Sequence, residues 1–189
     1  MAELAPGHDV VDVLTEDHHL VLELVTTISD FPDAESRRST VDTVIAELVR
    51  HSVAEEMFVY PAMRHHLADG DELVRHDIEE HQELEVTMKA LEGADPSGLE
   101  FNELVDTLEE QLRHHATDEE EEQFPKLRQQ LPEDVLVELG KKVVAAKELA
   151  PTRPHPASPH SELFHKTLGT GVGMVDKLRD VLSGRARNV

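Results

Sequence analysis

Apolar residues recur at spacings of three and four along most of this chain, which is the period of amphipathic α-helices. The first such segment runs from Asp9 to about Ser29, and the second carries its apolar face from Val41 to Phe58. A third extends from about Leu73 to Leu91, and a fourth from Phe101 to Glu119. No segment shows the sustained alternation of a β-strand. The pattern therefore predicts an all-α protein.

Short turn-forming segments separate the four predicted helices, at residues 31–34, 69–71 and 93–98. Because short connections place consecutive helices side by side and antiparallel, we predict an up-down-up-down four-helix bundle. Pro61 lies near the end of the second helix and is expected to kink that helix or tighten its end.

The chain of 189 residues is long enough for one domain with a proper core, and we expect the bundle to occupy residues 1–130. A proline at position 132 suits the first turn of an additional helix, predicted over residues 131–149. Residues 150–159 are rich in proline and predict an extended linker. Residues 160–189 predict a C-terminal amphipathic helix that docks on the bundle or mediates self-association.

Polar side chains interrupt the apolar faces of the second and fourth helices in the same way. His51 and Glu55 lie four residues apart, and His115 and Glu119 repeat that spacing. Residues four apart on a helix point nearly the same way, so each pair presents an imidazole and a carboxylate to one spot. A carboxylate on an apolar face is costly to bury unless something compensates its charge. The two pairs therefore predict a buried polar site.

The first and third helices each add one histidine to their apolar face. His18 lies 33 residues before His51, and His81 lies 34 residues before His115. An acidic residue precedes each of them, and a proline follows each His-x-x-x-Glu pair, at Pro61 and Pro125. The chain is thus a duplicated unit. Its four helices together bring four histidines and two carboxylates toward one centre, namely His18, His51, Glu55, His81, His115 and Glu119.

The amino-acid composition excludes some classes of binding partner and some types of metal site. Forty acidic residues against 18 basic ones give a net charge of -22, which repels nucleic acid and anionic membrane surfaces. The absence of cysteine excludes disulfides, thiolate zinc sites and cysteine-ligated iron–sulfur clusters, so histidine and carboxylate are the available strong ligands. No basic region followed by an apolar run opens the chain, and no apolar segment has spanning length. We expect a cytoplasmic protein.

Imidazole combined with carboxylate suits iron, manganese or zinc. A carboxylate with two oxygens can bridge two cations while cancelling their charge in an apolar interior. Two metal ions therefore fit this set of residues better than one.

The motifs resemble those of the hemerythrin-like family, the HHE cation-binding domains, over about residues 9–130. The resemblance rests on Asp17-His18, His51-Ser-Val-Ala-Glu55 with Tyr60-Pro61, Glu80-His81, and His115-Ala-Thr-Asp-Glu119 with Phe124-Pro125. It implies a non-heme centre of two iron ions with an oxo or hydroxo bridge. In that centre Glu55 and Glu119 would bridge the ions, and the four histidines would be terminal ligands.

The third helix departs from the oxygen-carrying hemerythrins, which have a His-x-x-x-His pair there and five histidines in all. The residue four before His81 is Asp77. Asp77 could supply an oxygen ligand in place of that nitrogen, water could fill the position, or Asp77 could be a partly exposed residue with no such role. We prefer Asp77 to His76 as the seventh ligand, because His76 lies about 140° round the helix from His81. Simple oxygen carriage is therefore in question.

Other polar residues near the motifs are assigned outer roles. Tyr60, Glu80 and Glu85 are candidate hydrogen-bond partners of the ligands, because metal-bound histidines usually donate their other nitrogen to a carboxylate or carbonyl. Asp118, Glu120 and Glu121 are expected to be solvated. The remaining histidines are expected on the surface or in the linker, at positions 8, 19, 65, 66, 76, 114, 155, 160 and 165.

The family resemblance implies a protein that binds or reduces a small diatomic or peroxidic species, such as dioxygen, nitric oxide or hydrogen peroxide, for sensing or detoxification. Catalase-like or nitric-oxide-scavenging activity falls within that class, and any electron donor would be a separate protein. The alternative is an iron-holding or iron-responsive module whose metal occupancy controls folding and partner binding, with the segment after Pro159 as the responsive element. An acidic helical scaffold without metal is the third hypothesis. The ligand, turnover and oligomeric state are left open.

Overall fold

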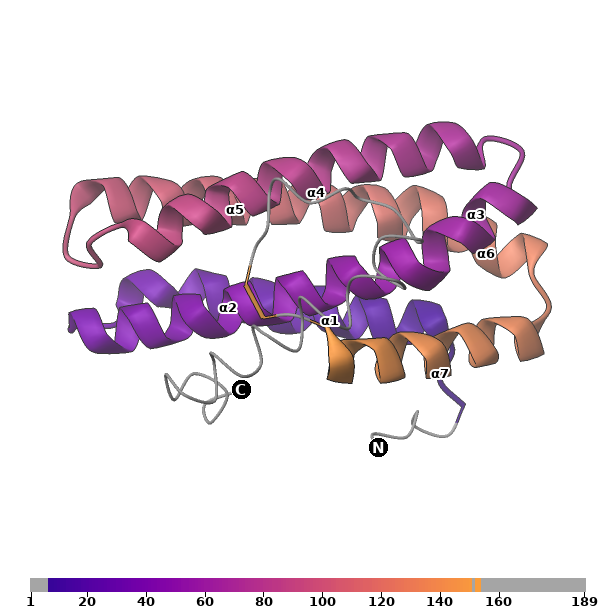
Figure 1. Cartoon of the computed structure of the whole chain (residues 1–189), viewed down its shortest axis with the longest axis horizontal. Helices are drawn as coiled ribbons and strands as arrows, with labels where there is room; N and C mark the ends of the chain where they lie inside the picture. The colour runs from indigo at the N-terminus through magenta and orange to yellow at the C-terminus, as the bar shows by residue number, and fades with distance from the viewer. Residues whose placement is uncertain (1–6, 151, 154–189) are drawn as a thin grey trace.

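The computed structural model describes residues 7–150, 152 and 153, and all its regular structure in that range is helical. Four long helical segments form the predicted antiparallel bundle, so the all-α class is confirmed (Figure 1). The helices in chain order are α1 (Val10–Thr27), α2 (Ala34–Ala54), α3 (Tyr60–His66), α4 (Gly70–Gly93), α5 (Leu99–Asp118), α6 (Phe124–Gln130) and α7 (Glu133–Leu149), with a 3₁₀ turn η1 (Ile28–Asp30) after α1.

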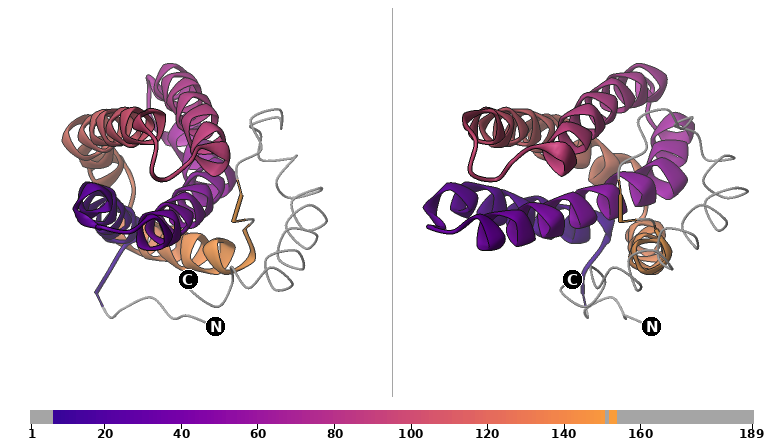
Figure 2. Two further views of the ribbon diagram at one scale, coloured as in Figure 1. Left: turned by 90° about the vertical axis from the view of Figure 1, so that its left-hand side faces the viewer. Right: turned by 60° about the vertical axis from the view of Figure 1, so that its left-hand side comes forward.

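The bundle consists of two helical hairpins packed face to face. Helix α1 packs against α2, and α4 packs against α5. Contacts of α1 with α5 and of α2 with α4 join the hairpins, so the four helices surround a common axis (Figure 2, left). Each helix therefore turns one face toward the same interior.

The second and fourth helices each continue through a π-helical turn. Turn η2 (Glu55–Val59) joins α2 to α3, and turn η3 (Glu119–Gln123) joins α5 to α6. The backbone N–H groups of Tyr60 and Phe124 donate to the carbonyls of Glu55 and Glu119, five residues back. Pro61 and Pro125 follow directly in the first turn of the next helix, where a missing N–H costs little. The chain thus absorbs each proline without ending the helix, and each π-helical turn begins at a glutamate of the His-x-x-x-Glu motif.

The connection from α3 to α4 is tight because α4 begins with a glycine. A Cβ atom on Gly70 would lie 2.2 Å from the carbonyl oxygen of Met63, far inside van der Waals contact. Glycine therefore lets the start of α4 press directly against the backbone of α3.

Helix α7 covers one side of the α1–α2 hairpin and also contacts η2 (Figures 1 and 2). Its buried face consists of Leu136, Leu139, Gly140, Val143 and Ala146. The helix predicted over residues 160–189 lies outside the described residues, as does most of the predicted linker 150–159. The same holds for the responsive element that the iron-responsive hypothesis places after Pro159.

The apolar core divides into two clusters along the bundle. One cluster joins the start of α1 to α3, α6 and α7, and the other fills the opposite end of the four long helices. Buried histidines and carboxylates lie in the stretch of each helix between the two clusters. A polar layer is thus enclosed by apolar packing from both ends. None of the described helices is both long and apolar enough to span a membrane.

Candidate metal centre

The fold brings all six predicted histidine and glutamate ligands into this polar layer. They come from each of the four long helical segments, and every one is buried: His18 on α1, His51 on α2, Glu55 in η2, His81 on α4, His115 on α5 and Glu119 in η3. The duplicated motif therefore builds a single interior site from both hairpins.

Glu55 lies between two of these histidines. Its Oε2 atom is 3.1 Å from Nε2 of His51 on its own helical segment and 3.3 Å from Nε2 of His81 on α4. One carboxylate thus faces imidazoles of both hairpins, as a bridging ligand must.

Glu119 repeats this arrangement with the other two histidines. Its Oε2 atom is 3.3 Å from Nε2 of His18 and 3.6 Å from Nε2 of His115. The Nε2 atoms of His18 and His51 are 3.2 Å apart, so these two imidazoles point at one spot. The candidate ligand atoms form two overlapping groups that share His115: one of His18, His51, His115 and Glu119, the other of Glu55, His81 and His115.

Several buried atoms of the site have no hydrogen-bond partner among the described residues. They are both carboxylate oxygens of Glu55, Oδ2 of Asp77, Nε2 of His115 and Oε2 of Glu119. A buried polar atom without a partner costs about 1–3 kcal/mol, and more when it is charged. Metal ions bound to these nitrogen and oxygen atoms would satisfy all of them at once, so the residues present fit a metal centre.

Asp77 is fully buried one helical turn before His81, which excludes a partly exposed position for it. Gln123 of η3 donates from Nε2 to Oδ1 of Asp77 at 2.6 Å. Burial, and then the neighbouring charge of Glu119, raises the pKa of Asp77 to about 8. Oδ2 of Asp77 is buried without a hydrogen-bond partner among the described residues, but Asp77 belongs to neither of the two groups of ligand atoms. Its role as a seventh ligand stays a prediction.

Each of the four histidines also has an outer carboxylate, which its Nδ1 atom faces. The pairs are His18 with Glu120 at 2.9 Å, His51 with Asp17 at 3.5 Å, His81 with Glu56 at 3.3 Å, and His115 with Glu80 at 3.0 Å. Such a contact fixes the tautomer and orientation of the ring and leaves Nε2 free to bind a metal.

The outer carboxylates follow a regular pattern in the sequence. Each one follows or precedes a candidate ligand directly in the sequence. Its carboxylate contacts the histidine on the neighbouring helical segment of the bundle, not on its own. Glu80 was predicted in such a role, whereas the expectation that Glu120 is solvated is wrong. A residue next to a ligand is rotated about 100° round the helix, toward the adjacent helix. Its position directly beside a predicted ligand is therefore the feature of the sequence that could have identified Glu120 as an outer carboxylate. Glu85 is half-buried on α4.

An aromatic ring packs on two of the histidines, again once in each half of the duplicated unit. Phe124 stacks on His18 with ring centroids 6.0 Å apart, and Tyr60 stacks on His81 with centroids 5.6 Å apart. The hydroxyl of Tyr60 lies 3.2 Å from Nε2 of His81, which places a phenol at the centre, as predicted. Burial and the surrounding carboxylates hold the pKa of Tyr60 well above its ordinary value, so this hydroxyl keeps its proton.

In the metal-free protein, protons on buried histidines balance the negative charges of the neighbouring carboxylates. Burial alone would lower the pKa of His51, but Glu55 and Asp17 raise it to about 10. Carboxylates similarly hold the pKa of His81 well above its ordinary value, against the effect of burial. Burial opposes ionisation of Glu55, yet the imidazoles of His51 and His81 keep its pKa well below the usual range. Metal ions entering the site would displace these imidazole protons.

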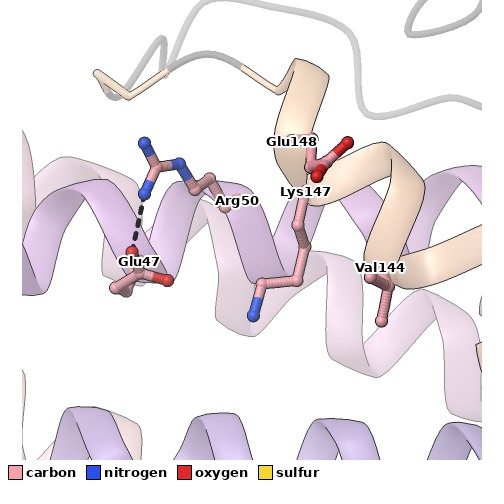
Figure 3. A pocket seen from close by; sticks show the side chains of 5 residues that line it. All are labelled: Glu47, Arg50, Val144, Lys147 and Glu148. Atoms are coloured by element: carbon pink, nitrogen blue, oxygen red, sulfur yellow. Dashed lines mark hydrogen bonds and ion pairs between the residues drawn. The ribbon is translucent and has the colours of Figure 1, made fainter. Parts of the chain in front are cut away.

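Helix α7 reaches the outer part of the centre through Lys147. This ammonium contacts Oδ1 of Asp17, whose other oxygen faces His51. Lys147 also lines a surface cleft between α2 and α7, together with Glu47, Arg50, Val144 and Glu148 (Figure 3). Within the cleft Arg50 donates to Glu47 at 2.6 Å. Lysine 147 therefore links the additional helix to a residue that orients a candidate ligand.

Comparison with known proteins agrees with this geometry. The family model of the hemerythrin HHE cation binding domain matches residues 9–127. An uncharacterised hemerythrin-like protein of Schizosaccharomyces pombe is 28% identical over 92% of this chain and 86% of its own length. A DNA nickase of a Nostoc species is 26% identical over 74% of this chain, and the match covers 39% of the nickase.

Among solved structures, a hemerythrin HHE cation binding domain-containing protein from Mycobacterium kansasii aligns with a TM-score of 0.65 and 25% identity. The alignment covers 75% of this chain and 86% of that protein.

Proposed function

Since the chain belongs to the hemerythrin HHE cation-binding family, whose domains bind metal ions, we propose that its buried cluster holds two iron ions. The proposed ligands are His18, His51, His81 and His115 as terminal donors, Glu55 and Glu119 as bridges, and Asp77 as the seventh ligand.

The observation that carries this proposal is the placement of the two glutamates. Each has an oxygen within 3.6 Å of Nε2 of a histidine from both hairpins. Each also leaves at least one buried oxygen with no hydrogen-bond partner among the described residues. Two bridging carboxylates between two pairs of imidazoles match the needs of two adjacent divalent cations.

Within this class we propose that the protein binds or reduces a small ligand, namely dioxygen, nitric oxide or hydrogen peroxide, in sensing or detoxification. Iron held by these residues would supply the redox chemistry for such a ligand. The outer carboxylates would hold the four imidazole rings in the orientation that metal binding needs. The Tyr60 hydroxyl could donate a hydrogen bond inside a site enclosed by apolar side chains. Electrons for reduction would come from a separate donor.

Metal analysis tests the centre itself. Chain reconstituted anaerobically with ferrous iron is expected to hold two iron ions after removal of excess metal. Replacing Glu55 or Glu119 by glutamine should lower that stoichiometry and abolish the iron-dependent charge-transfer absorption. The matched control is Glu121→Gln, an exposed glutamate in the same π-helical turn as Glu119. Wild-type protein without stoichiometric iron would refute the proposal.

The ligand is tested on the iron-loaded protein by adding dioxygen, nitric oxide and hydrogen peroxide in turn. Binding changes the iron-dependent spectrum, and reduction of peroxide is followed by its loss and by dioxygen release. Tyr60→Phe removes the hydroxyl and keeps the ring, so it should weaken the response to the true ligand while leaving the iron content unchanged. A spectrum indifferent to all three ligands would contradict this function while leaving the metal centre intact.

A further inference from the structure

A second cluster of metal-ligating side chains lies on the outer surface of the α4–α5 hairpin. It consists of His76 and Glu80 on α4 and of His114 and Asp118 on α5. Each helix contributes a histidine and a carboxylate four residues apart, so both pairs point to one spot between the two packed helices. None of these four residues is among the proposed ligands of the buried centre.

The spacing of the cluster suits a small cation better than direct hydrogen bonds. Nε2 of His76 is 3.5 Å from Oε1 of Glu80 and 3.5 Å from Oδ2 of Asp118. Across the hairpin, Nε2 of His114 is 3.5 Å from Oε1 of Glu80, and its Nδ1 is 3.6 Å from Oδ1 of Asp118. One ligand atom from each of the four residues lies within 4.8 Å of the other three. Ligands of a tetrahedral zinc ion at about 2.1 Å stand roughly 3.4 Å from one another, so the four side chains would have to close slightly around the ion.

One oxygen of the cluster is left unsatisfied. Oε1 of Glu80 is buried and has no hydrogen-bond partner among the described residues, although two imidazole nitrogens lie on either side of it. Glu80 therefore presents to the cluster a buried oxygen that two imidazole nitrogens approach at 3.5 Å.

The cluster is also open to solvent and has the right charge. The side chains of His76 and His114 are 46% and 63% exposed, so an ion can reach them without any rearrangement of the core. Two carboxylates with two neutral imidazoles balance a divalent cation, and the net charge of -22 raises the local concentration of cations.

We propose that His76, Glu80, His114 and Asp118 form a second metal site, which takes one divalent transition cation of the zinc type. Two nitrogens and two oxygens are a set of ligands that such ions accept, and one such atom from each residue lies within 4.8 Å of the others. Glu80 connects this surface site to the buried centre, because its Oε1 faces the surface cluster while its Oε2 accepts from Nδ1 of His115 at 3.0 Å. A substitution of Glu80 would disturb both sites, so the test uses the two exposed histidines.

The experiment measures zinc bound by the untagged full chain after its buried centre has been loaded with iron. Wild-type protein is expected to bind one zinc ion in equilibrium dialysis with its iron content unchanged. His76→Asn combined with His114→Asn should lose this zinc ion, and Asp118→Asn should weaken its binding at least about tenfold. The matched control is His65→Asn combined with His66→Asn, which removes two exposed histidines from α3 and should keep the zinc ion.

The outcomes separate the two sites. Equal zinc binding by wild type and the His76/His114 variant would mean adventitious binding only and would overturn the proposal, as would wild-type protein that binds no zinc. Equal loss of zinc in the His65/His66 control would overturn it too. Iron measured in the same samples reports on the buried centre, so its failure is distinguishable from failure of the surface site.

Discussion

Asp77 is a carboxylate whose charge is expected to differ between the metal-free and the metal-loaded protein. It is fully buried, accepts a hydrogen bond from Gln123 on one oxygen and has no partner for the other oxygen among the described residues. Its pKa of about 8 means that the metal-free protein keeps it largely neutral at pH 7. A cation nearby would favour its ionised form.

Replacing Asp77 by asparagine tests its role as a ligand. Asparagine keeps the acceptor for Gln123 but carries no charge, so we expect the iron affinity to fall by about 10–100-fold. Above pH 8 the metal-free variant should be more stable than wild type by about 1–3 kcal/mol, because no buried carboxylate has to ionise. Chelator competition and urea unfolding measure the two effects. Unchanged iron affinity would reduce Asp77 to a hydrogen-bond partner of Gln123.

The outer carboxylates give a second prediction for single residues. Glu120 accepts from Nδ1 of His18 at 2.9 Å, and Glu121 beside it is exposed. Glu120→Gln replaces a charged acceptor with a neutral one, so His18 becomes a poorer donor to metal and the iron affinity should drop by about tenfold or more. Glu121→Gln removes the same charge from the same turn and should leave iron binding within twofold of wild type. Equal effects of the two changes would point to bulk charge alone.

The ligands and their partners were not equally visible in the sequence. His51 and Glu55 were recognisable because polar side chains stood on an apolar helical face at a spacing that the second half of the chain repeats. Glu120 was hidden because it belongs to a run of acidic residues that resembles a solvated face. Asp77 is hydrogen-bonded to Gln123, which lies buried in a π-helical turn, and helical periodicity alone does not predict such a turn.

At the scale of elements, the two π-helical turns determine where the bridging carboxylates lie. The sequence predicts that Pro61 kinks the second helix or tightens its end, and the expectation of a bundle does not depend on which of the two occurs. The structure shows that Glu55 and the next residue, Glu56, are both buried in η2. The carboxylate of Glu55 lies against the Nε2 atoms of His51 and His81, whereas the carboxylate of Glu56 lies against the Nδ1 atom of His81. The turn thus supplies a candidate ligand and an outer partner from adjacent residues.

The packing of α3 on α4 gives a prediction with an internal control. Gly70→Ala would place a Cβ atom 2.2 Å from the Met63 carbonyl oxygen and force the start of α4 away from α3. We expect this change to destabilise the protein by about 1–3 kcal/mol. Gly93→Ala at the other end of α4 meets nothing within 4 Å and should be neutral or slightly stabilising. Urea unfolding measures the stability of both variants, and equal stability of Gly70→Ala and Gly93→Ala would contradict the close packing of α3 on α4.

At the scale of the whole molecule, the helical structure extends beyond the residues that match the family model. The match covers residues 9–127, whereas α7 runs from Glu133 to Leu149 and packs on α1 and α2. Lys147 on α7 contacts Asp17, which faces His51. The additional helix therefore contributes both apolar cover and one cation to the surroundings of the centre, in a chain that is otherwise strongly acidic.

The balance of protons across the centre predicts how the stability of the metal-free protein depends on pH. The folded-state pKa of His51 is about 10 against an ordinary value of 6.5, so its contribution is complete below about 6.5 and is lost as the pH rises through 10. Asp77, with a folded-state pKa of about 8 against 3.8, acts in the same direction, because up to pH 8 the folded state binds a proton that the unfolded state has released. Glu55, whose pKa is lowered, contributes stability that disappears only on acidification.

Metal-free protein should therefore lose about 2 kcal/mol or more of unfolding free energy between pH 7 and pH 10. Protein loaded with iron and freed of excess metal should lose much less, because the metal has already displaced the protons from the imidazoles. Urea unfolding of both forms at pH 7, 8.5 and 10 measures the difference. His51→Gln lacks the titrating imidazole, so the metal-free variant should show a shallower decline over the same range. A metal-free wild type whose stability does not change from pH 7 to 10 would contradict the protonated pairing of His51 with Glu55 and Asp17.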